Sequence, residues 1–101
     1  MLAMPPGPPY YVYVLSNRAR TVLYIGMTNG LRRRLREHRT DTADSFTREY
    51  NVRDLVYYER FDTARAAIDR EKQLKRWRRD KKEALIRSEN PALDALPPPI
   101  D

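Results

Sequence analysis

At 101 residues, with 41% hydrophobic and 34% charged side chains, the chain is long enough for one globular domain, too short for two, and too apolar for intrinsic disorder. It has no cysteine, which excludes a disulfide framework and a cysteine-ligated zinc site, and no apolar run approaches the roughly 18 residues that span a bilayer, so we expect a cytoplasmic protein. The net charge is +6; residues 65–87 hold ten Lys or Arg against four Asp or Glu, and residues 31–39 hold five arginines against Glu37. Two such basic segments favour a polyanionic partner such as nucleic acid, although a solvated helix surface is the commoner reason for any single run of charge.

A β-hairpin is predicted near the start of the chain. The segments "YYVYVLS" (10–16) and "TVLYIGM" (21–27) are rich in aromatic and β-branched residues, and the polar "NRAR" between them indicates a short turn. With the loop centred in this turn, antiparallel pairing places Tyr13 directly opposite Tyr24, so that the two phenols project from one face of the sheet. Gly26 follows on the same face, where its missing side chain leaves room for another group to approach.

A short basic helix is predicted directly after the hairpin. It begins near Gly30, where Thr28 or Asn29 can cap its first turn. Leu31 and Leu35 form its apolar stripe, which we expect to pack against the sheet.

The arginines of this helix divide into two groups. Arg34 and His38, the only histidine, lie four residues apart beside the apolar stripe and are expected to face the sheet. An arginine directed toward the body of a protein requires a partner or a ligand, because burying an unpaired charge is costly. The remaining arginines of the helix are expected to point to solvent: Arg32, Arg33 and Arg36.

The second half of the chain predicts one more strand and two helices. Residues 40–51 are polar and irregular, and "DLVYYERF" (54–61) is predicted to be the third strand. Thr63 can cap a helix over about 64–77, and a last helix over 80–88 ends before "NP", because the residue before a proline disfavours helical geometry.

The helix over 64–77 carries an unexpected carboxylate. Ala64, Ala67, Ile68 and Leu74 form one small and apolar stripe, and Glu71 falls inside it. A carboxylate in such a stripe is partly desolvated. It is either one half of an ion pair with an inward arginine, which is the common arrangement, or a metal ligand or acid–base group.

Two tyrosines, an arginine, a histidine and a glutamate are thus predicted to face inward. Each alone has an ordinary structural explanation. Together they supply the groups that phosphodiester cleavage requires: a carboxylate for a hard divalent cation, an arginine for the phosphate, and a phenol or imidazole that deprotonates water.

At these residues the sequence resembles the GIY-YIG nuclease superfamily, specifically its small single-domain bacterial members related to the N-terminal domain of excinuclease C. The tripeptides that correspond to the name of the family are "YVY" (11–13) and "YIG" (24–26), with ten residues between them. Tyr11 stands where the family's first glycine is usual. The resemblance covers roughly residues 10–96, and the family's polar residues fall, in order, at Tyr13, Tyr24, Arg34, His38, Glu71 and Asn90.

The resemblance implies an α/β (α+β) fold in which helices flank a central three-stranded antiparallel sheet. It also implies a nuclease domain over 10–96 between flexible tails at 1–9 and 97–101. The implied activity is that of a divalent-metal-dependent DNA endonuclease, in DNA repair or recombination, that works as a monomer or weak homodimer without a small-molecule cofactor.

The implied mechanism uses one Mg²⁺ or Mn²⁺ ion per site, with Glu71 as its ligand. Tyr24 acts as general base toward water, with Tyr13 and His38 positioning that water or relaying its proton, and which of Tyr24 and His38 accepts the proton stays open. Arg34 stabilises the pentacovalent phosphate. Because a free phenol titrates near pH 10, Tyr24 needs positive charge nearby to work near neutrality.

A second interpretation is a non-catalytic nucleic-acid-binding module that keeps the nuclease fold and its charge. The presence of all six polar residues favours the enzyme, because binding alone does not require Glu71. In either case the basic segments are expected to contact DNA through the following residues: Arg32, Arg33, Arg36, Lys75, Arg78, Arg79, Lys81 and Lys82.

Overall fold

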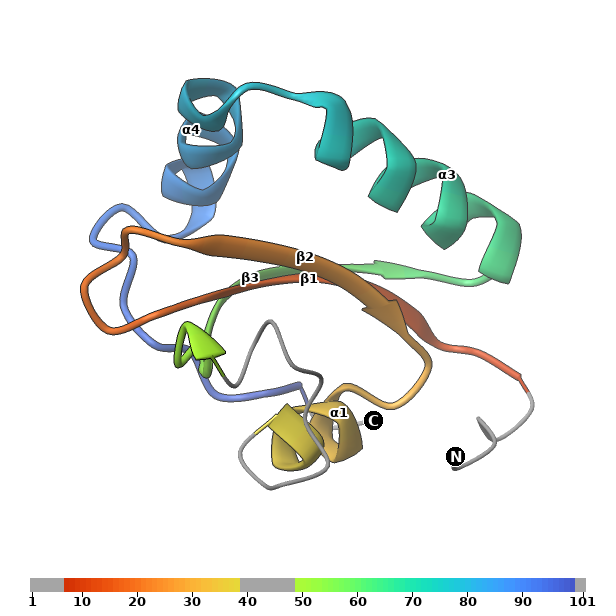
Figure 1. Cartoon of the computed structure of the whole chain (residues 1–101). Helices are drawn as coiled ribbons and strands as arrows, with labels where there is room; N and C mark the ends of the chain where they lie inside the picture. Colours follow the sequence, from red (N-terminus) through yellow and green to blue (C-terminus); the bar gives the residue numbers. More distant parts are fainter. Residues whose placement is uncertain (1–6, 39–48, 100–101) are drawn as a thin grey trace.

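The computed structural model describes residues 7–38 and 49–99 of the chain. Three antiparallel strands form one sheet in the order β2-β1-β3, and Figure 1 shows α1 on one face of this sheet and α3 and α4 on the other. The elements are β1 (Tyr10–Ser16), β2 (Leu23–Thr28), α1 (Leu31–His38), β3 (Asp54–Phe61), α3 (Ala64–Arg76) and α4 (Arg79–Glu89). This confirms the predicted α+β fold with a three-stranded sheet, whereas most of the predicted tails and of the irregular segment 40–51 lies outside the described residues.

The central strand β1 is buried on both sides, so the protein has two hydrophobic cores. On the α1 side, Tyr11 and Leu15 of β1 pack with Leu31 and Leu35 of α1. Both leucines of α1 are almost fully buried, with exposed fractions of 0% and 3%. Each such side chain contributes roughly 1.5–3 kcal/mol when it leaves water, which is enough to fix this short helix against the sheet.

The second core lies between the sheet and the helices α3 and α4. Val12 and Val14 of β1 pack there with Ala67 and Leu74 of α3. The predicted apolar stripe of α3 includes one residue that is not buried, because Ile68 is 36% exposed. Thr63 caps this helix as predicted, and its hydroxyl accepts a hydrogen bond from the Ala66 amide at 3.2 Å. None of the helices in the described ranges is both long and apolar enough to cross a membrane.

The hairpin of β1 and β2 has a different register from the predicted one. Tyr13 lies opposite Gly26, and Leu15 lies opposite Tyr24, so the predicted direct pair of Tyr13 with Tyr24 is wrong by two residues. Because successive side chains of a strand alternate between faces, a shift of two residues leaves both phenols on the same face. The two rings are therefore diagonal neighbours, with centroids 6.5 Å apart.

The side chain of Asn17 explains this register. Its Oδ1 accepts hydrogen bonds from the backbone amides of Thr21 and Val22, at 2.9 and 3.0 Å. The turn is completed by Arg20, which adopts a left-handed backbone with φ of 60°. The loop is thus centred one residue later than predicted, because Asn17 holds its end and Arg20 accepts the strained conformation.

Candidate active site

Four of the predicted site residues meet on the face of the sheet that α1 covers. The Tyr13 hydroxyl lies 3.3 Å from Nε2 of His38, and Nε of Arg34 donates a hydrogen bond to the same hydroxyl at 3.3 Å. The Tyr24 ring centroid lies 6.5 Å from that of Tyr13 and 5.6 Å from that of His38. We call this group, which draws on β1, β2 and α1, the tyrosine cluster: Tyr13, Tyr24, Arg34 and His38.

The members of the tyrosine cluster differ in their access to solvent. Tyr13 is 1% exposed and His38 is 2% exposed, whereas Tyr24 is half-buried and the side chain of Arg34 is 30% exposed. Among the described residues, Tyr24 and Arg34 are thus the members of the cluster that solvent reaches, whereas Tyr13 and His38 are almost fully buried.

Gly26 makes the position of Tyr13 possible. Because Gly26 lies directly opposite Tyr13 in the sheet, the tyrosine ring rests over its backbone. A Cβ atom at Gly26 would lie 2.5 Å from both Cζ and the hydroxyl oxygen of Tyr13, which is closer than real carbon contacts allow. The space above Gly26, which we expected to admit another group, is therefore filled by the ring of Tyr13.

We expect Gly26→Ala to displace the Tyr13 ring and to lower the free energy of unfolding by about 1–3 kcal/mol, the usual cost of overpacking a core. Chemical denaturation measures the loss. The double variant Gly26→Ala/Tyr13→Ala is the control, since it removes the clash and should be less destabilised than the sum of the two single changes. Strictly additive losses would contradict the contact.

Tyr13 and Glu37 are among the partners that hold Arg34. Its Nε donates a hydrogen bond to the Tyr13 hydroxyl, and its Nη1 donates one to Oε1 of Glu37 at 3.0 Å. Burial alone would lower the pKa of this guanidinium, but the hydrogen bonds to Tyr13 and Glu37 raise that pKa above its ordinary value. Arg34 therefore stays charged at any pH at which the fold exists. The spacing of Arg34 and Glu37 on α1 could have indicated this pair from the sequence, since residues three apart are neighbours on a helix.

Contrary to the prediction, Arg33 does not point to solvent. Its side chain is 27% exposed, about as covered as that of Arg34, and its Nε lies 3.6 Å from Oε2 of Glu37. The guanidinium folds back over the first turn of α1, where a Cβ atom at Gly30 would lie 3.2 Å from its Cζ. Arg32 and Arg36 are exposed, as predicted.

Glu71 belongs to α3, the helix that packs on the face of the sheet opposite α1 (Figure 1). Its side chain is 21% exposed and forms an ion pair with Lys75 on the same helix, at 3.4 Å. Lys75 in turn lines a hollow of about 300 Å³, which we call the β2-edge hollow: Leu23, Tyr24, Ile25, Lys75 and Lys82. Tyr24 thus belongs to both the cluster and the hollow, and Lys75 links the hollow to Glu71.

Comparison with known families identifies the chain. A family model described as the GIY-YIG catalytic domain matches residues 9–84. The chain belongs to the GIY-YIG family. The matched range contains the whole tyrosine cluster and Glu71, and it ends within α4 before Asn90.

Relatives of this GIY-YIG protein are small proteins of similar length. A UPF0213 protein of Natronomonas pharaonis is 42% identical over 80 residues, which are 79% of this chain and 93% of that protein. A UPF0213 protein of Haloquadratum walsbyi is 38% identical over 76 residues, 75% of this chain and 84% of that protein. The solution NMR structure of a UPF0213 protein from Bacillus halodurans shares the fold with a TM-score of 0.56 and 27% identity, covering 84% of this chain and 89% of that one.

Asn90 has a structural role in this GIY-YIG domain, and its predicted catalytic role stays a prediction. It ends α4, and its Nδ2 donates hydrogen bonds to the carbonyl oxygens of Val56 and Asp94, at 3.0 and 2.8 Å. Its Oδ1 accepts a hydrogen bond from the Asp94 amide at 3.1 Å. These contacts hold Asn90 to β3, at the opposite edge of the sheet from Tyr24 in β2.

Arg79, one of the predicted DNA contacts, also holds two parts of the GIY-YIG fold together. Arg79 donates hydrogen bonds to the carbonyl oxygens of Thr21 and Arg20, at 2.6 and 2.8 Å, and so ties α4 to the turn of the hairpin. Lys81 lies over the ring of Trp77, with Nζ 4.2 Å from the ring centroid. Among the remaining predicted contacts, the following are exposed: Arg32, Arg36, Lys75, Arg78 and Lys81.

Proposed function

We propose that this protein is a divalent-metal-dependent DNA endonuclease that hydrolyses phosphodiester bonds, in DNA repair or recombination. The observation that carries the proposal is the tyrosine cluster, in which a buried pair supports an accessible phenol and an accessible guanidinium. Membership of the GIY-YIG family, whose model describes a catalytic domain, supports the same chemistry.

In this proposal each member of the cluster has a separate task. The deprotonated oxygen of Tyr24 accepts a proton from the attacking water, because Tyr24 is the accessible acid–base group of the cluster. Arg34 binds the non-bridging oxygens of the phosphate and stabilises the charge that builds up on them. Tyr13 and His38 position these two groups from below, through the hydrogen bonds of the Tyr13 hydroxyl.

Glu71 is the side chain that would hold one Mg²⁺ or Mn²⁺ ion. The residues that the structure describes contain no group of three or more metal-binding side chains. A single carboxylate still fits Mg²⁺, because this ion commonly takes one or two carboxylates and fills its shell with water and phosphate oxygens. When bound, the ion would supply Lewis-acid stabilisation of the leaving oxygen.

A screen of DNA substrates tests the proposal. Nicked, flapped, branched, single-stranded and plasmid DNA would be incubated with the protein in Mg²⁺, in Mn²⁺ and in EDTA. We expect cleavage of at least one substrate with either metal and none in EDTA. Binding without cleavage of every substrate would instead support the non-catalytic nucleic-acid-binding module.

The exposed basic residues are expected to supply affinity that does not depend on DNA sequence. Replacing Arg32 and Arg36 of α1, or Arg78 and Lys81 near α4, by glutamine should weaken binding. Each phosphate contact removed should reduce the slope of log K against log salt concentration by about 0.7–0.9. Fluorescence anisotropy at several salt concentrations measures the slope, and a pair that leaves it unchanged does not lie on the DNA-binding surface.

A further inference from the structure

We propose that the β2-edge hollow binds a second phosphate of the DNA strand, next to the phosphate that Arg34 binds. This inference rests on the proposed function, because it assigns the path of the same substrate. It makes Lys75 and Lys82 positioning residues that set which phosphate of the strand reaches the tyrosine cluster.

The position of the hollow supports this assignment. Three consecutive residues of β2 form one wall, and β2 is an outer strand of the sheet. Tyr24, the middle residue of the three, also contacts the tyrosine cluster on the α1 side. A strand of DNA that crosses the outer edge of β2 therefore meets Arg34 on one side of the sheet and the hollow on the other.

The lining of the hollow matches the chemistry of a nucleotide. Lys75 from α3 and Lys82 from α4 bring two ammonium groups from different helices to one hollow. Leu23, which is only partly buried, supplies apolar surface beside them, and this suits the deoxyribose that follows each phosphate. No carboxylate is among the residues that line it, although Glu71 lies next to it and pairs with Lys75.

The ion pair of Lys75 adds a consequence for Glu71. Lys75 lies 3.4 Å from the Glu71 carboxylate and its side chain is 55% exposed. The flexible stem of a lysine allows its ammonium group to turn toward another anion. A phosphate in the hollow competes with Glu71 for this ammonium group. DNA in the hollow therefore releases the Glu71 carboxylate at the moment when the substrate is in place.

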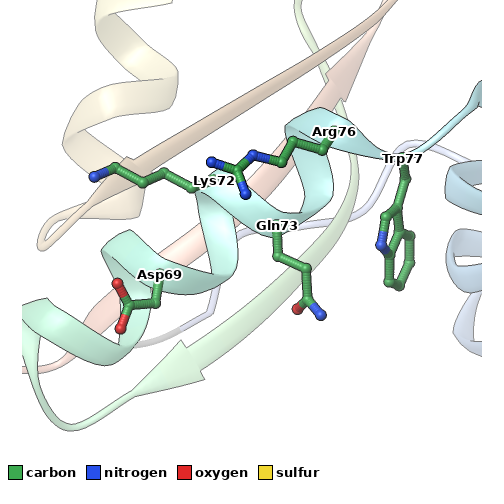
Figure 2. Close-up of a pocket in the computed structure, with 5 residues that line it drawn as sticks. All are labelled: Asp69, Lys72, Gln73, Arg76 and Trp77. Atoms are coloured by element: carbon green, nitrogen blue, oxygen red, sulfur yellow. The ribbon is translucent and has the colours of Figure 1, made fainter.

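A second hollow on α3 offers a matched control. It has a volume of about 380 Å³, and Figure 2 shows Lys72, Arg76 and Asp69 along the helix with Trp77 after its end. Here Asp69 adds a carboxylate to the lining, and the ammonium group of Lys81 already lies over the Trp77 ring. We therefore expect phosphate to prefer the β2-edge hollow, although both hollows contain two basic side chains.

The test follows the binding of thymidine 3′,5′-bisphosphate by NMR in EDTA, where no cleavage takes place. We expect the amide signals of residues 23–25 and of Lys75 and Lys82 to shift. The double variant Lys75→Gln/Lys82→Gln should bind the bisphosphate about tenfold more weakly, the effect of losing a hydrogen bond to a charged group. The control variant Lys72→Gln/Arg76→Gln should bind within about twofold of the wild type, as expected for distant surface charges.

Three results would overturn the inference. If the amide signals of other regions shift instead, the phosphate binds elsewhere. If the two double variants lose affinity equally, the effect is due to net charge alone. Inorganic phosphate that binds as tightly as the bisphosphate would make the hollow a simple anion site without strand recognition. Because this measurement needs no catalysis, it can succeed while the cleavage screen fails, so the two proposals are tested separately.

Discussion

Replacing Arg34 by lysine is expected to lower the single-turnover rate of DNA cleavage by about 10²-fold or more, the usual scale for losing a preorganised donor to a transition state. Lysine keeps the positive charge but loses the planar fork that binds two phosphate oxygens at once. It also cannot reproduce the geometry in which Nε contacts Tyr13 while Nη1 contacts Glu37. Single-turnover rates at saturating protein separate this effect from binding.

The matched control for this change is Arg36→Lys. Arg36 lies on the same helix and is exposed, whereas Arg33 is as covered as Arg34 and shares the Glu37 carboxylate, so Arg33 is a poor control. Arg36→Lys should cleave within a few-fold of the wild type. If both variants lose activity to the same extent, the distinction between inward and outward arginines on α1 is wrong.

Glu71→Gln is expected to abolish metal-dependent cleavage while the fold and DNA binding stay nearly unchanged. Glutamine keeps the shape of the side chain but lacks the charge that holds a divalent cation. The change in stability should be small, because the partner of Glu71 is Lys75 on the same helix, and such surface pairs contribute about 0.3–0.5 kcal/mol.

Melting temperature and turnover should be measured on the same Glu71→Gln preparation. A clear loss of stability with retained cleavage would mean that Glu71 is a structural ion-pair partner and that the metal lies elsewhere. Lys75→Gln is the companion variant. It breaks the same ion pair but leaves the carboxylate, so the cleavage that it retains should still require Mg²⁺ or Mn²⁺.

Local sequence patterns predicted the strands and helices well, and they also predicted that Arg34 and His38 face the sheet. The residues of β1 and β3 agree with the predicted strands, and helical spacing placed Arg34 and His38 on the inner face of α1. These predictions succeed because strand alternation and helix periodicity depend only on neighbouring residues.

The features that the sequence did not predict depend on long-range contacts. Arg79 and Asn90 bind backbone carbonyl oxygens of the hairpin and of β3, and such partners are far away in the sequence. The hairpin register depends on the side chain of Asn17, and the Arg33 side chain turns back toward Gly30 and Glu37. The face of the sheet that α3 covers is likewise set by the tertiary fold, which periodicity cannot reveal.

The most direct test of the catalytic role of the tyrosine cluster is single-turnover cleavage by Tyr24→Phe, with DNA binding measured in parallel in EDTA. Phenylalanine keeps the aromatic ring but removes the hydroxyl that accepts the proton of the attacking water. We expect Tyr24→Phe to bind DNA as the wild type does and to cleave it at least about 10²-fold more slowly, the lower range of effects from losing a general base. Cleavage at the wild-type rate by this variant would contradict the assignment of Tyr24 as the general base.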